Sequence, residues 1–105
     1  MVNSPGRASN GEVPRRLREL RRAEGILTAA AFAQLLGATT ARYGNIESGA
    51  YKLSIRVAHA VVDAVPGMTL DWLYYGREGG LEPPLRDRLL AAREEIASEA
   101  RRLSR

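Results

Sequence analysis

The amino-acid sequence predicts an all-α fold, in which a compact domain of five short helices is followed by a longer C-terminal helix. Apolar residues recur at intervals of three and four along most of the chain, the spacing that places them on one face of a helix. Several of these stretches begin after Ser or Thr and end at Gly, the residues favoured at the two ends of a helix. A length of 105 residues suits one small domain with short tails.

The stretch over residues 28–49 predicts two short helices joined by a tight turn. The first covers about 29–36 and ends at Gly37, a residue that readily adopts the left-handed conformation of a helix C-cap. Thr39 is a good N-cap for a second helix over about 40–48. Two helices joined by a turn of three to four residues that contains Gly form the outline of a helix-turn-helix.

The second of these helices has two different faces. At about 100° per residue, one side collects small or polar residues, namely Thr40, Ala41, Gly44, Asn45 and Ser48. Tyr43, Ile46 and Glu47 lie on the other side, with Arg42 at the edge. The small polar side is suited to lie against a flat polar surface, whereas Tyr43 and Ile46 are expected to pack on the first helix.

Three further helices are expected to complete the domain. The first covers Pro14 to Glu24, because Pro suits the first helical position. Its apolar stripe, extended just beyond the helix, consists of Leu17, Leu20, Ile26 and Leu27. The other two follow N-cap residues at Ser54 and Thr69 and end near Val65 and Gly76. His59 is expected to be a partly buried packing residue, since no second His or Cys can share a metal with it.

Four segments are expected along the chain: a flexible tail over 1–12, the helical domain over 13–76, a linker over 77–84 and a C-terminal helix over 85–105. In the last helix an apolar stripe repeats at alternating spacings of four and three, which is a short heptad pattern. It consists of Leu85, Leu89, Ala92, Ile96 and Leu103. Such a stripe is buried either against its own domain or against the same helix of a second subunit, as a dimerisation element, and the sequence leaves both open.

Composition limits the classes of function. Lys and Arg total 16 against 12 Asp and Glu, a basic balance that suits a polyanionic partner. The absence of Cys excludes a Cys-ligated zinc site, and no cofactor is expected. One His and no clustered carboxylates leave no set of catalytic groups, so we do not expect an enzyme. Without a membrane-spanning apolar run or the apolar segment of a signal peptide, we expect a cytoplasmic protein with no membrane partner.

Four pieces of sequence, taken in order, carry a resemblance to a known family. They are RLRELRRAEG, then LTAAAFAQLLGATTARYGNIESG, then a helix ending in VVDAVPG, then TLDWLYYG. Over about residues 14–76 the chain resembles the Cro/repressor-type (XRE-like) helix-turn-helix transcriptional regulators. The resemblance implies a lambda-repressor-like domain that binds double-stranded DNA sequence-specifically with helix 40–48 in the major groove. It also implies a homodimer on a near-palindromic operator.

The resemblance also assigns roles to individual residues. Thr40, Ala41 and Asn45 fall where the family reads base edges, and Asn and Thr side chains suit such contacts. Phosphate or flanking contacts are expected from Thr28, Ala29, Thr39, Arg42, Tyr51 and Lys52. Gly44, inside the same helix, either permits a close approach to DNA or marks a less constrained position. Ala29 stands where the family often has Gln, so one polar group near the DNA is missing.

Arg21 and Glu47 match a pair that bridges helices in this family, and we expect a partly buried ion pair that orients helix 40–48. Two classes of function stay open. The first is a DNA-binding transcriptional regulator, most simply a repressor, with Asn45 as the main base reader and phosphate contacts supplying much of the affinity. The alternative is an antitoxin-like or adaptor module that uses the same fold to bind a protein partner through the apolar stripe of its last helix.

Overall fold

The computed structural model describes residues 5–104, and their side chains from residue 12 onward. This part of the chain is built from six α-helices and contains no strand, which confirms the predicted all-α fold. The helices are α1 (Pro5–Ala23), α2 (Ala29–Leu36), α3 (Thr40–Glu47), α4 (Ile55–Ala64), α5 (Leu70–Tyr75) and α6 (Pro83–Leu103). Within this part, no helix is both long and apolar enough to cross a membrane.

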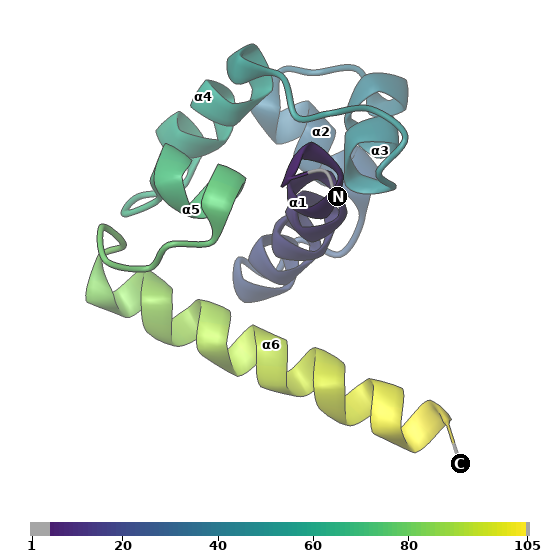
Figure 1. Cartoon of the computed structure of the whole chain (residues 1–105), viewed down its shortest axis with the longest axis vertical. Helices are drawn as coiled ribbons and strands as arrows, with labels where there is room; N and C mark the ends of the chain where they lie inside the picture. Colours follow the sequence, from purple (N-terminus) through teal and green to yellow (C-terminus); the bar gives the residue numbers. More distant parts are fainter. Residues whose placement is uncertain (1–4, 105) are drawn as a thin grey trace.

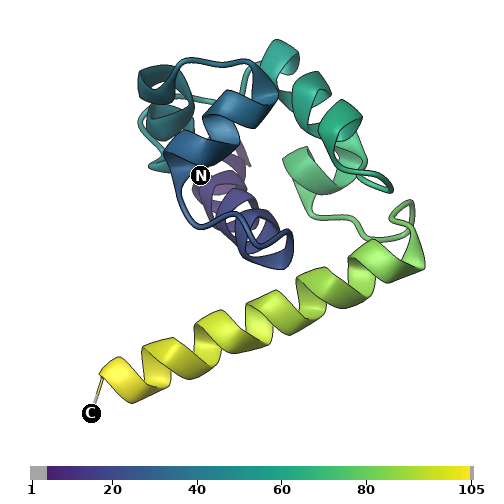
Figure 2. The same ribbon diagram turned by 180° about the vertical axis from the view of Figure 1, so that it is seen from behind.

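Helix α1 lies at the centre of the fold. Figure 1 shows α3 and α5 on opposite sides of α1, with α2 and α4 closing the domain at the end far from α6. Helix α6 packs along the remaining side of α1. Figure 2, the view from behind, shows that the C-terminal end of α6 extends away from the other helices.

Helices α3 to α5 begin at the N-caps that the sequence predicts, and α2 begins in the same way after Thr28. In each case the cap hydroxyl accepts a hydrogen bond from the backbone amide three residues later, at 3.0 to 3.2 Å. The four caps are Thr28, Thr39, Ser54 and Thr69. Helix α2 ends at Gly37, which adopts a φ of +73° in the left-handed region. These local signals fix the length of the α2–turn–α3 unit.

The core joins α1 to the α2–turn–α3 unit. Leu17 and Leu20 of α1 are fully buried, as the apolar stripe predicts. Phe32 of α2 meets Tyr43 of α3 edge-on, with ring centroids 5.3 Å apart. Ile46 is also buried, so the inward face predicted for α3 is confirmed.

The first helix is longer than predicted. It begins at Pro5 rather than at Pro14, so the segment expected to be a tail over 1–12 is helical from Pro5, while residues 1–4 lie outside the described residues. Pro14 sits inside the helix and is buried. Its side chain lies 3.5 Å from the place that a Cβ on Gly49 would occupy. Tertiary packing at Pro14 therefore outweighs the preference of proline for a first helical position.

Helix α6 begins at Pro83, within the segment predicted as a linker over 77–84, and Leu81 of that segment is buried. The first half of the predicted apolar stripe packs against the rest of the chain: Leu85, Leu89 and Ala92 are each at most 3% exposed. The sequence left open whether the stripe is buried against its own domain or against a second subunit. These three residues are buried against their own domain. The far end of the stripe differs, since Leu103 is 84% exposed.

Some residues expected to be covered are exposed. Leu27, which the sequence places in the apolar stripe after the first helix, is 90% exposed. His59 is exposed as well, not partly buried as expected. Helical spacing identifies residues that share a face, but it does not tell whether another element covers the whole of that face.

Candidate nucleic-acid interface

The outer face of α3 is the first part of the candidate site. Thr40 and Ala41 are exposed on it, and Gly44 and Asn45 are half-buried beside them. The Asn45 side chain has no hydrogen-bond partner among residues 12–104, so its amide can donate and accept outward. The structure thus brings together the residues expected to read bases.

Two helix N-termini add backbone donors to this region. The Thr28 and Thr39 hydroxyls each satisfy one amide of the first turn, those of Ala31 and Arg42. The first two amides of α2 and of α3 have no partner within the helix. Such amides, together with the positive end of the helix dipole, bind phosphate well. The Ala29 side chain packs against the core, so this residue can contribute to binding only through its backbone.

The inner face of α3 is anchored to α1. The predicted ion pair is present: Arg21 Nη2 lies 2.8 Å from Glu47 Oε1, with 17% and 9% of the two side chains exposed. The Tyr43 hydroxyl donates to Glu47 Oε2 at 2.6 Å, and Arg18 donates to the Glu47 carbonyl. Burial, and then the Glu47 carboxylate, raise the pKa of Tyr43 above its ordinary value. This buried network sets the orientation of α3.

The loop after α3 folds back on that helix. The Tyr51 amide donates to the Asn45 carbonyl at 3.0 Å. The side chains of Tyr51 and Lys52 are exposed, so both expected contact residues are free to meet a ligand beside α3.

Most cationic side chains of the domain already have partners. Each described arginine of α1 donates to a carboxylate or a carbonyl: Arg15, Arg16, Arg18, Arg21 and Arg22. Arg77 pairs with Asp71. Over residues 12–80, the cationic side chains without a protein partner are those of Arg42, Lys52 and Arg56. All three lie in α3, in α4 or in the loop between them.

Arg56 is a residue that sequence reasoning missed. It lies in the first turn of α4, two residues after the Ser54 cap. A cation there is opposed by the positive end of the helix dipole, so its presence is a weak sign of an anionic partner. This signal needs only the cap at Ser54, which the sequence reveals.

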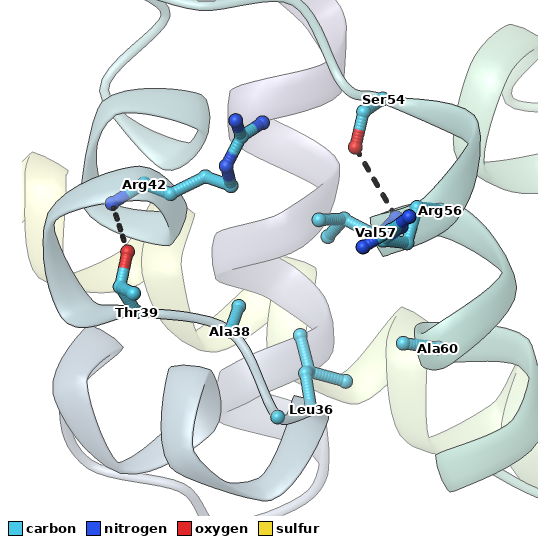
Figure 3. A pocket seen from close by; sticks show the side chains of 9 residues that line it. Leu36, Ala38, Thr39, Arg42, Ser54, Arg56, Val57 and Ala60 are labelled. Carbon is cyan, nitrogen blue, oxygen red and sulfur yellow. Dashed lines mark hydrogen bonds between the residues drawn. The ribbon is translucent and has the colours of Figure 1, made fainter.

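Arg42 and Arg56 line the same cavity of about 490 Å³, between the α2–α3 turn and the start of α4. Figure 3 shows Arg42 extending from α3 toward the side on which Ser54 and Arg56 lie. Leu36, Val57 and Ala60 supply its apolar lining. The cavity flanks the outer face of α3.

A family model described as a helix-turn-helix domain matches residues 13–66. The match runs from α1 through α4 and contains each residue expected to contact DNA. No curated protein and no solved structure matches the chain.

Proposed function

Since this chain belongs to the helix-turn-helix domain family, whose model covers residues 13–66, we propose that it is a sequence-specific DNA-binding transcriptional regulator. The observation that carries the proposal is the gathering of binding groups around α3. An exposed polar face, two open helix N-termini and three unpaired cationic side chains, those of Arg42, Lys52 and Arg56, lie in one region. Elsewhere in residues 12–80 the cations have partners.

In the proposed complex, the outer face of α3 lies in the major groove. Asn45 can bond an adenine through both its donor and its acceptor, and the methyl groups of Thr40 and Ala41 can contact thymine. The amides at the start of α2 and α3 hold the DNA backbone. With so few base-reading groups, phosphate contacts supply most of the affinity, and binding weakens steeply with salt.

We infer that the regulator binds as a homodimer and represses, because a bound dimer excludes other proteins from its operator. Two α3 helices about 34 Å apart would then read the two halves of a near-palindromic site. With Leu85, Leu89 and Ala92 buried in their own domain, the dimer contact falls to the far half of α6, where Ile96 is half-buried and Leu103 is exposed.

The dimer contact is tested by Leu103→Glu, with Leu90→Glu as the matched control because Leu90 is an exposed leucine in the first half of α6. Sedimentation equilibrium is expected to show monomers for the first variant and dimers for the second. A dimer that survives Leu103→Glu rejects this contact.

The function is tested by selecting bound sequences from random DNA. The wild type is expected to enrich a two-part site. Asn45→Ala should relax preference at particular positions of that site, whereas Gln34→Ala, which truncates an exposed amide on α2, should leave it unchanged. Arg42→Ala should weaken binding to all sequences and lower its salt dependence. If no sequence is enriched, the proposal fails.

An antitoxin-like or adaptor module is the second candidate function. It is favoured by exposed Leu27, and by a cavity of about 490 Å³ that this residue lines together with Ile26 and Ile96. A stoichiometric complex with one protein, lost in Leu27→Ala, together with no enriched DNA sequence, would establish it in place of the first.

A further inference from the structure

We propose that Arg42 and Arg56 form a single phosphate-binding site in the cavity between α3 and α4. The inference goes beyond the proposed function, because it assigns one shared phosphate to two side chains that come from different helices. Where DNA supplies the phosphate, the inference rests on the proposed function.

The two guanidinium groups have no counter-charge in the part of the chain whose side chains the structure describes. Over residues 12–104, neither side chain has a hydrogen bond or an ion pair, although most arginines of this chain have one. Each also lies in the first turn of its helix, Arg42 after the Thr39 cap and Arg56 after the Ser54 cap. Both positions place a cation at the unfavourable end of a helix dipole. A bound anion would offset the unfavourable dipole interaction at both helix ends.

The cavity is lined by donors suited to a phosphate. Both cap residues, Thr39 and Ser54, line it together with the two arginines, so α3 and α4 begin at its edge. Each cap hydroxyl is engaged by the third amide of its helix, which leaves the first two amides of each helix without a partner. Planar guanidinium groups match the paired oxygens of a phosphate. The cavity therefore offers donors from two helices to one group.

The location of the cavity indicates which phosphate it takes. It flanks the outer face of α3 instead of lying on it, since Arg42 sits at the edge of that face. With α3 in the major groove, a cavity on this flank faces the strand that borders the groove. A backbone phosphate held there would set the register in which Asn45 meets the bases. A free phosphate or phosphate monoester has the same chemistry, and the experiment separates the two sources.

The first arm measures the salt dependence of binding to the selected DNA, by fluorescence anisotropy, for Arg42→Ala, Arg56→Ala and the double variant. Each phosphate neutralised contributes about 0.9 to the slope of log K against log salt. For one shared phosphate, the double variant should lose about 0.9, not about 1.8. Arg86→Ala is the control, since it removes an exposed arginine of α6 that has no partner among residues 12–104. It should not change the slope.

The second arm uses inorganic phosphate and needs no DNA. Amide NMR spectra are recorded as phosphate replaces chloride at constant ionic strength. Amides of residues 39–42 and 54–57 are expected to shift saturably in the wild type and in Arg86→Ala, but not in Arg56→Ala. Thermal unfolding confirms that each variant is folded.

The two arms distinguish the two sources of phosphate. A reduced slope in Arg56→Ala supports the site with DNA as the source. The site is supported with free phosphate as the source if the phosphate-dependent amide shifts require Arg56 while the salt slope of DNA binding is unchanged in Arg56→Ala. The inference is overturned if Arg56→Ala changes neither, or if the double variant loses about 1.8 from the slope, since two separate phosphates are then bound. Should the wild type bind no DNA, the proposed function fails, and the second arm alone decides on the cavity.

Discussion

Arg21 of α1 and Glu47 of α3 are joined by hydrogen bonds from both Nε and Nη2 of the guanidinium to the carboxylate. The remaining nitrogen, Nη1, donates to the carbonyls of Ile26 and Leu27 in the loop before α2. One side chain thus holds the end of α3 and the entry to α2 against the same helix. This arrangement fixes the C-terminal end of α3 and the N-terminal end of α2 relative to each other.

Arg21→Ala should destabilise the fold by about 3 kcal/mol, because it leaves a largely buried carboxylate without its charged partner. The measurement is urea unfolding at neutral pH. The neighbouring residue provides the control: Arg22 pairs with Glu95 and Glu99 on the surface, where ion pairs contribute little. Arg22→Ala should therefore cost much less. If the two variants lose the same free energy of unfolding, the buried pair of Arg21 contributes no more to stability than the surface pairs of Arg22.

Tyr43 should make stability fall at alkaline pH. Its pKa lies above the ordinary value of 10.0, first because of burial and then because its hydroxyl bonds Glu47. The unfolded chain loses the hydroxyl proton near pH 10, while the folded chain keeps it. The contribution of Tyr43 to the free energy of unfolding is therefore fully present below pH 10 and declines above it. At pH 11 the loss from this residue is about 1.4 kcal/mol.

Tyr43→Phe removes this titration. At pH 8 the variant should be less stable than the wild type by about 2 kcal/mol, because a hydrogen bond to a charged group is lost. By pH 11 the difference should narrow by about 1.4 kcal/mol. Denaturant unfolding at the two pH values is the measurement, and the exposed tyrosines cancel because both proteins carry them. The same difference at both values would mean that Tyr43 titrates normally in the fold.

Most of the fold was predictable because its signals are local. The caps at Thr39, Ser54 and Thr69 and the stop at Gly37 act within a few residues, and the structure reproduces them. Pro14 shows the limit. Pro14 lies inside α1 and beside Gly49, more than thirty residues away in the sequence, and no local pattern reports such a neighbour.

The candidate site was predictable only where a motif marks it. Asn45 and Arg42 lie in α3, where the motif directs attention, and the pair of Arg21 with Glu47 follows from the resemblance. For Arg56 the sequence offers only its place in the first turn after the Ser54 cap, and its lack of a partner was known only from the folded chain. Pairing is a property of the folded chain, so sequence alone does not tell which cations are left without a partner.

The two glycines that close α2 and α5 should respond differently to substitution. Gly37 and Gly76 have φ values of +73° and +75°, so alanine costs about 1 to 2 kcal/mol of backbone strain at either. A Cβ at Gly37 meets nothing within 4 Å, whereas one at Gly76 lies 3.1 Å from Nη1 of Arg16. That guanidinium cannot retreat easily, because it is buried and bonded to the carbonyls of Leu73 and Tyr74.

Gly76→Ala should therefore lower the free energy of unfolding more than Gly37→Ala does. Urea unfolding of both variants measures the difference, from which the shared backbone term cancels. If the two losses are equal, the Arg16 side chain yields without cost, and its two hydrogen bonds do not hold it in place.

Gly44→Ala should separate the stability of the fold from the binding of DNA. Gly44 is a glycine within α3 that does not have a positive φ, and a Cβ there meets nothing within 4 Å. Alanine should therefore raise the free energy of unfolding by about 1 kcal/mol. If the absent side chain permits close approach to the duplex, the same methyl group should weaken DNA binding by about 1 kcal/mol or more.

Gly79→Ala is the matched control, because it adds the same methyl group in the loop between α5 and α6, also with nothing within 4 Å. It should leave DNA affinity unchanged. Anisotropy titrations with the selected DNA, beside urea unfolding, give both quantities for each variant. A Gly44→Ala protein that is more stable and binds DNA as tightly as the wild type would show that Gly44 is only a less constrained position. If Gly44→Ala raises the free energy of unfolding but lowers the affinity for DNA, the backbone of α3 lies against the DNA.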